Sequence, residues 1–130
     1  MPASIEYLIN ISTIQYFCIM KDWTEIKSEA DVYNIIENST TKPQIIFKDS
    51  TSCGISAHAK ERLMDGYSQI EGKAGFNYLD LLSFRPVSKF IAETLEVTHQ
   101  SPQIIVLRDK KVIYATSHHS ISPAGIAKYL

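Results

Sequence analysis

The chain has 130 residues, of which 45% are apolar and 21% charged, and its formal net charge is −1. This length is typical of one domain with one core, and the composition is that of an ordinary globular protein. The small net charge and the scattered basic residues argue against nucleic acid or an anionic membrane as a partner. Two cysteines are too few for a disulfide framework, and no basic residue precedes Lys21 to form a secretory signal. We therefore expect a protein of the reducing cytoplasm.

The first 20 residues differ from the rest of the chain. They are rich in Ile and Tyr, but polar residues interrupt the run, which is too short and too polar to span a bilayer comfortably. Two interpretations stay open: an additional N-terminal strand or helix, or a segment upstream of a natural start at Met20. We predict an extension at 1–20 and a domain at 21–130.

Apolar runs and helix-start patterns follow one another along the domain. They predict five strands, at 23–26, 44–48, 76–82, 103–107 and 112–116, the last two joined by a turn at 109–111. Four helices alternate with or follow these strands. The first begins with a capping box at Ser28 and Asp31, the second runs from Cys53 to about Met64, the third from Pro86 to Leu95, and the fourth begins at Ser122 and Pro123. Strands that alternate with helices and end in a hairpin predict an α/β fold with a mixed central sheet flanked by helices.

The polar stretch from Ser50 to Ser56 is the strongest candidate for chemistry. It places Cys53 at the first turn of a predicted helix, where unpaired N–H groups and the helix dipole stabilise a negative charge. The thiolate is the nucleophilic form of cysteine. An inert, buried cysteine is the alternative, since free cysteines are often core residues. A disulfide between Cys18 and Cys53 is conceivable but not expected, because it would block this thiol.

Ser56 is three residues after Cys53, in the place where a dithiol reductase has its second cysteine. Serine cannot form a disulfide, so the site is predicted to work by a monothiol route, in which a second small-thiol molecule releases the first. Ser56 shares a helix face with Cys53 and can donate a hydrogen bond to the thiolate. We assign Cys53 and Ser56 as the catalytic residues.

Several short motifs, in this order and spacing, resemble one known family. They are Phe47-Lys48 through Cys53-Gly54-Ile55-Ser56-Ala57, Tyr78-Leu79-Asp80-Leu81-Leu82, Arg85-Pro86-Val87-Ser88, His99-Gln100-Ser101-Pro102-Gln103 and Ala115-Thr116-Ser117-His118. The chain resembles the YtxJ-like family of bacillithiol system redox-active proteins, within the thioredoxin superfamily. The likeness covers roughly 23–130. The sequence departs from the family's usual pattern at two positions. Gly54 follows the cysteine, where the family often has Pro, and Asp49 stands where the family often has His.

The resemblance implies a thioredoxin-like fold and a cytoplasmic, single-cysteine site that exchanges thiols with bacillithiol, a low-molecular-weight thiol. Cys53 matches the redox cysteine, and Pro102 matches a proline held in cis facing the active site, although only about 5–6% of X–Pro bonds are cis. We assign substrate binding to Ser101 and Pro102, and to Ser52 and Gly54. The expected partners are the small thiol, as co-substrate, and client proteins that carry it.

Other polar residues are predicted to have ordinary roles. Lys60 and Arg62 are expected to be solvated helix charges, and His99 a solvated loop side chain that could at most assist proton transfer. The pair His118-His119 lacks a Cys or Asp partner at suitable spacing, so no metal site is predicted. We expect no cofactor apart from the thiol co-substrate.

Two other functions stay open. Cys-Gly-Ile-Ser is similar to the Cys-Gly-Phe-Ser site of monothiol glutaredoxins, which hold an iron–sulfur cluster between two subunits. The chain has no Gly-Gly-Cys-Asp-like segment after the hairpin, where those proteins bind the carboxylate of the thiol. The remaining alternative is a non-catalytic, thioredoxin-like interaction module.

Overall fold

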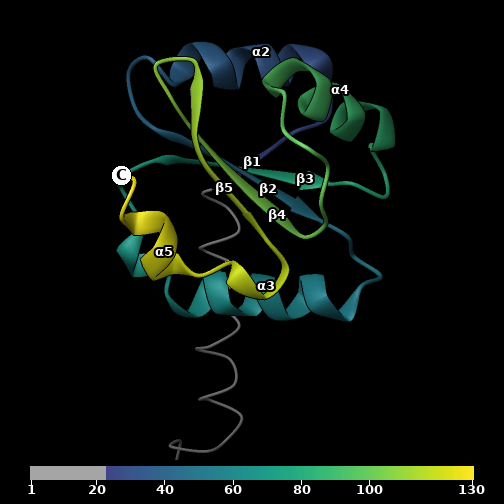
Figure 1. Cartoon of the computed structure of the whole chain (residues 1–130), viewed down its shortest axis with the longest axis vertical. Coiled ribbons are helices and arrows are strands. Elements are labelled where there is room, and N and C mark those ends of the chain that lie inside the picture. The colour runs from purple at the N-terminus through teal and green to yellow at the C-terminus, as the bar shows by residue number, and fades with distance from the viewer. Residues whose placement is uncertain (1–22) are drawn as a thin grey trace, which may run out of the picture.

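The computed structural model describes residues 23–130, which form three layers: a central sheet with helices on both faces (Figure 1). The strands are β1 (Thr24–Glu25), β2 (Gln44–Asp49), β3 (Gly75–Asp80), β4 (Gln103–Arg108) and β5 (Lys111–Ser117). The helices are α2 (Glu29–Asn38), α3 (Gly54–Asp65), α4 (Arg85–Leu95) and α5 (Pro123–Ala127), with single 3-10 turns η1 (Tyr67–Gln69) and η2 (His118–Ser120). The predicted order of elements and the mixed α/β sheet are confirmed.

The sheet has the strand order β1-β3-β2-β4-β5. The strands β1, β3 and β2 are parallel, whereas β4 pairs antiparallel with β2, and β5 antiparallel with β4. Because Asp49 pairs with Asp80, β2 and β3 end at the same edge of the sheet, and the pairing of Lys48 with Gln103 brings the start of β4 to that edge. A bulge between Val106 and Leu107 interrupts the register with β5.

Two hydrophobic cores lie on opposite faces of the sheet, because alternate residues of a strand point to opposite sides. On one face, Ile45 and Phe47 of β2 pack with Ala59 and Leu63 of α3. On the other face, Ile46 packs in a cluster with residues of β3, α2 and α4. All six residues of β2 are buried, as expected for a strand covered on both faces.

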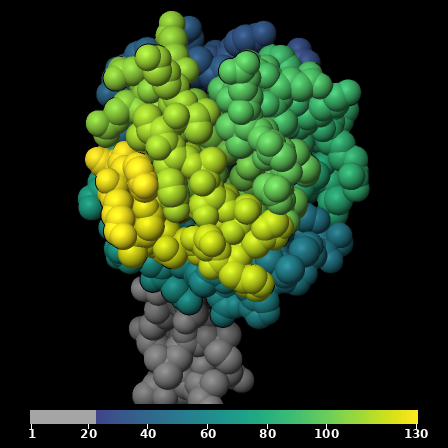
Figure 2. All heavy atoms as spheres, in the orientation of Figure 1, coloured from purple at the N-terminus to yellow at the C-terminus, as the bar shows by residue number. Residues whose placement is uncertain are grey.

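The helix cap and the hairpin turn that the sequence predicted are both present. Ser28 caps α2, and its hydroxyl and the Asp31 carboxylate form the reciprocal bonds of a capping box. The hairpin between β4 and β5 turns through Asp109 and Lys110, whose φ angles of 51° and 67° are those of a two-residue turn that matches the twist of the strands. The stacked rings of Tyr114 and Tyr129 join β5 to the C-terminal segment, and Figure 2 shows these two parts of the chain side by side.

The predicted extension at 1–20, the proposed start at Met20 and the residue Cys18 lie outside the described residues. Within 23–130, no helix is both long enough and apolar enough to span a bilayer.

Candidate functional site

Cys53 is the N-cap residue of α3, at the sheet edge where β2 ends. Its backbone is extended, with φ −103° and ψ 126°, and its carbonyl accepts the first helical bond, from Ala57 N at 3.1 Å. Its own N–H donates to Ser50 O at 2.9 Å, which closes the short turn from β2 into the helix. The side chain is partly exposed and is a free thiol. The alternative of an inert cysteine enclosed in the core therefore does not describe this residue.

The helix start lowers the pKa of the Cys53 thiol below its ordinary value. The largest cause is a hydrogen bond from the backbone N–H of Ser56, followed by one from the N–H of Ile55. Partial desolvation opposes them, and the Ser56 hydroxyl contributes a further bond that lowers the pKa. These donors are the unpaired N–H groups of the first helical turn, so the thiolate occupies the place of a side-chain cap.

Ser56 is fully buried, with 0% of its surface exposed, and its hydroxyl has two roles. It accepts a hydrogen bond from Ser50 N at 3.2 Å, and its interaction with the thiol favours the thiolate. The residue therefore holds the turn before the cysteine against the helix that follows it. The structure brings Cys53 and Ser56 together, as their spacing indicated.

A second polar cluster lies beside the thiol, around Asp49. This buried carboxylate accepts a hydrogen bond from the Tyr78 hydroxyl at 2.5 Å, and Lys60 Nζ lies 3.9 Å from it and over the Tyr78 ring. Burial raises the pKa of Asp49, against the opposing effects of Tyr78 and Lys60. Its negative charge is in turn the weakest of the influences on Cys53, and it raises the pKa of the thiol. Asp49 and Lys60 line a cavity of about 350 Å³ together with Ser50, Thr51 and Ala57.

The Ser101–Pro102 peptide bond is cis, directly before β4. Pro102 O accepts a hydrogen bond from His118 N at 3.0 Å, which fixes the segment against the end of β5. Since Gln103 pairs with Lys48, Ser101 and Pro102 lie at the same sheet edge as the turn that carries Cys53. Pro102 is buried, and Ser101 Oγ is a buried hydroxyl that has no hydrogen-bond partner in the described part of the protein.

The surface next to the thiol is open. Ser52 and Gly54, on either side of Cys53, are exposed, and a Cβ built on Gly54 would meet no atom within 4 Å. Ile55, a large apolar side chain, is 38% exposed. The immediate surroundings of Cys53 thus offer backbone, small side chains and one apolar contact to an approaching molecule.

The sequence matches the family model of the monothiol bacilliredoxin BrxC over residues 24–126. The chain belongs to this family. The membership supports a thiol redox function and agrees with the resemblance that the sequence motifs indicated. Cys53 is the only cysteine within the matched residues.

Similar solved structures show the fold of this chain. A protein with a thioredoxin fold has a TM-score of 0.73 and 23% identity, over 84% of this chain and 94% of that chain. Mitochondrial thioredoxin 3 from Saccharomyces cerevisiae, in its oxidized form, has a TM-score of 0.64 and 19% identity, over 88% and 95%. Thioredoxin from Trypanosoma brucei brucei has a TM-score of 0.64 and 14% identity, over 82% and 85%. The thioredoxin-like fold is thereby confirmed.

Two polar residues of this chain, Lys60 and Arg62, do not have the solvated roles predicted for them. Lys60 is only partly exposed and joins Asp49, as described above. Arg62 donates from Nε to Ile121 O and from Nη2 to His118 O, both at 3.0 Å, so it ties α3 to the segment after β5. His99 is exposed in a loop, as predicted, but its ring also contacts Lys48 and Ser88, which was not predicted. The predictions for Lys60 and Arg62 were wrong because their partners are up to 59 residues away in the chain.

Sequence reasoning also missed the roles of Tyr78 and Lys48. Tyr78 was part of an apolar strand pattern, and its hydroxyl contact with Asp49 follows from the pairing of β2 with β3. A lysine inside an otherwise apolar run is unusual, and this was the available indication for Lys48. Within 23–130, no group of three or more His, Cys, Asp or Glu side chains could hold a metal ion.

Proposed function

We propose that this chain is a monothiol oxidoreductase that removes bacillithiol, or a similar low-molecular-weight thiol, from mixed disulfides on client proteins. The observation that carries the proposal is the partly exposed Cys53 thiol, stabilised as thiolate by two backbone N–H groups, with Ser56 in place of a resolving cysteine. A reducing compartment such as the cytoplasm suits this chemistry, because the site has to return to the free thiol after each cycle.

The reaction takes two thiol–disulfide exchanges. In the first, the Cys53 thiolate attacks the sulfur of the small thiol in the client mixed disulfide; a new disulfide forms on Cys53, and the client leaves as a thiolate that takes a proton from solvent. In the second, the thiolate of another small-thiol molecule attacks this adduct. The small thiol leaves as its symmetrical disulfide, and Cys53 is again a thiolate. The second small-thiol molecule is thus the reductant.

The neighbouring residues have distinct parts in this proposal. Ser56 stabilises the attacking and departing sulfur of Cys53 by its hydrogen bonds. The small and exposed Ser52 and Gly54 leave room for the incoming disulfide. Ser101 and Pro102, at the same sheet edge, would bind the backbone of the client or of the small thiol.

The experiment measures alkylation and exchange on the same proteins. The rate of alkylation by iodoacetamide across pH should give a pKa for Cys53 below about 8.5, the value of a free cysteine. A peptide carrying bacillithiol as a mixed disulfide should be reduced by wild type and by the control Cys18→Ser, but not by Cys53→Ser. An alkylation midpoint at or above 8.5, or exchange that survives Cys53→Ser, contradicts the proposal.

The two alternative functions give different results. An iron–sulfur carrier would become coloured on anaerobic reconstitution with iron, sulfide and the small thiol, and would lose the colour in Cys53→Ser. A non-catalytic module would bind partners equally well with Cys53→Ser and show no exchange in either form.

A further inference from the structure

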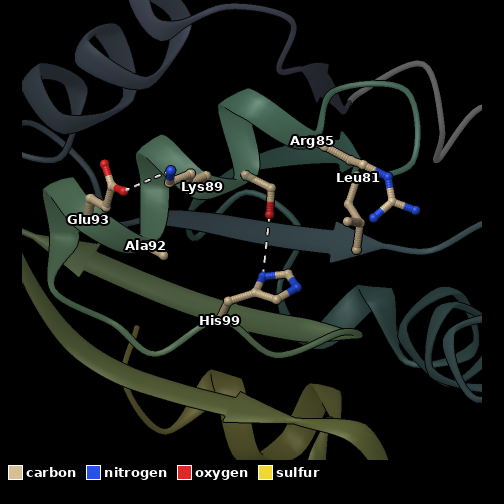
Figure 3. Close-up of a pocket in the computed structure, with 7 residues that line it drawn as sticks. Leu81, Arg85, Lys89, Ala92, Glu93 and His99 are labelled. Atoms are coloured by element: carbon tan, nitrogen blue, oxygen red, sulfur yellow. Dashed lines mark hydrogen bonds and ion pairs between the residues drawn. The ribbon is translucent and has the colours of Figure 1, made fainter.

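A second cavity, of about 390 Å³, lies between α4 and the segment that leads into β4. Figure 3 shows its lining, which includes Leu81 at one end, Arg85, Lys89 and Glu93 along α4, and His99 on the opposite side. The cavity is on the face of the sheet that α4 covers, whereas α3 and the Asp49 cluster are on the other face. The cavity and α3 therefore lie on opposite faces of the sheet.

The strongest feature of this region is a buried cation, Lys48. Its surface is 0% exposed, and its Nζ donates to Ser88 O at 3.1 Å and to His99 Nδ1 at 3.3 Å. None of the ion pairs in the described part of the chain includes Lys48. A charge that is buried without an opposite charge is costly, so an anion close to it would be bound favourably.

His99 connects the buried ammonium group to the cavity. Its Nδ1 lies close to both Lys48 Nζ and the Ser88 hydroxyl, which is 3.4 Å away. An ammonium group can only donate, so Nδ1 accepts and the ring carries its proton on Nε2. Burial, and then the charge of Lys48, lower the pKa of His99, which keeps the ring neutral. Because His99 lines the cavity, its Nε2–H is the ring donor left for a molecule bound there.

Positively charged side chains outnumber carboxylates at the cavity. Arg85 and Lys89 line it, and the single carboxylate in the lining, Glu93, is already paired with Lys89 at 3.8 Å. Lys48 lies behind the lining, in contact with Ser88 and His99. Arg85 stands at the other end of α4 from Glu93, with its guanidinium group beside Leu81 (Figure 3). A guanidinium group and an imidazole N–H, backed by a buried ammonium group, are donors suited to anionic oxygens.

We propose that this cavity binds the carboxylate or phosphate group of a small molecule, with Arg85 and His99 as its donors and Lys48 as the buried counter-charge. The parallel strands β2 and β3 end together, with Cys53 four residues and Arg85 five residues beyond the paired Asp49 and Asp80. The Arg85 end of the cavity thus lies at the sheet edge of the thiol. Two sources of the anion fit this placement: a free small anion, or an acidic group of the thiol that reacts at Cys53.

The first test needs no thiol exchange. Inorganic phosphate and malonate are titrated into the full chain by calorimetry, at constant ionic strength kept with sodium chloride. Saturable binding is expected, and Arg85→Gln and His99→Ala should each weaken it by roughly tenfold, the effect of losing one charge-assisted bond. Lys73→Gln, an exposed lysine outside the cavity, and Cys53→Ser should bind as wild type does. Absence of saturable binding, or equal affinity in Arg85→Gln, overturns the site.

The second test identifies the source and rests on the proposed function. The KM of exchange is measured with a thiol that carries carboxylates, such as bacillithiol, and with uncharged 2-mercaptoethanol. If the anion belongs to the thiol, Arg85→Gln raises KM roughly tenfold for the first thiol alone. If the site takes a free anion, neither KM changes although phosphate binding is lost. Failure of all exchange, with phosphate binding intact, refutes the redox proposal and leaves the anion site standing.

Discussion

Replacing Lys48 by methionine should change how the stability of the protein depends on pH. The substitution keeps a long, unbranched side chain but removes the buried ammonium group. Burial lowers the pKa of Lys48 from 10.5 to about 8. Because one pH unit corresponds to about 1.36 kcal/mol, the folded protein holds the charged lysine at a cost of about 3 kcal/mol relative to the unfolded chain.

Stability rises with pH because Lys48 binds its proton more tightly in the unfolded chain than in the folded protein. Below pH 8 Lys48 is charged in both states, so the whole cost is present. Between pH 8 and 10.5 the folded state loses the proton while the unfolded state keeps it, and the free energy of unfolding rises by about 3 kcal/mol. Above 10.5 neither state is charged and the cost is gone. Lys48→Met has no proton to lose and should lack this rise.

The two hydrogen bonds of Lys48 reduce the gain from its removal. Each contributes about 1 kcal/mol, so Lys48→Met should be about 1 kcal/mol more stable than wild type at pH 7 and about 2 kcal/mol less stable at pH 10.5. Urea unfolding can be followed by fluorescence of Trp23, the single tryptophan, which is 6% exposed. Buffers should contain neither phosphate nor carboxylate. Lys73→Met, at an exposed position, is the control and should keep the wild-type rise. A difference between wild type and Lys48→Met that stays constant from pH 7 to 10.5 would refute the reasoning.

Three further substitutions test the surroundings of the thiol. Asp49→Asn removes a charge that raises the pKa of Cys53, so the pH profile of iodoacetamide alkylation should move to lower pH; a shift to higher pH would contradict this electrostatic account. Ser56→Ala should move the same profile to higher pH, because the thiolate loses the hydroxyl donor. It should also lower the free energy of unfolding by about 1–3 kcal/mol, because Ser50 N loses its acceptor. An unchanged profile would show that the backbone donors alone lower the pKa of Cys53. Arg62→Met should lower the free energy of unfolding by a similar ~1–3 kcal/mol in urea titrations, because the partly buried carbonyls of Ile121 and His118 lose a charged donor. Alkylation should stay as in wild type, and a shifted alkylation profile would mean that Arg62 also acts on the site.

Local chemistry explains why the fold and the thiol environment could be predicted from sequence. The cap at Ser28, the Asp109-Lys110 turn and the apolar strand runs each depend on residues within a few positions of one another. The same is true of Cys53, whose stabilising donors come from the two residues Ile55 and Ser56. Helix capping and strand burial leave patterns that can be recognised without knowing the tertiary structure.

Pairing across the sheet explains why the rest could not be predicted. The environment of Lys48 depends on Ser88 and His99, 40 and 51 residues away, which meet it only after α4 has packed on the sheet. Asp49 is similar, because Tyr78 and Lys60 reach it from a neighbouring strand and from the helix over it. The roles of these charged residues in the two polar clusters therefore emerged from packing alone.

The bulge in the last hairpin has a consequence for self-association. The strand β5 is at the border of the sheet, and an unpaired border strand is a template on which a second chain could extend the sheet. The shift at Val106 and Leu107 leaves Ile113 out of register and 38% exposed, and Lys110 and Lys111 place positive charge where β5 begins. Within 23–130 no further strand pairs with β5, but a strand with this bulge and with lysines at its start is a poor template for edge-to-edge aggregation.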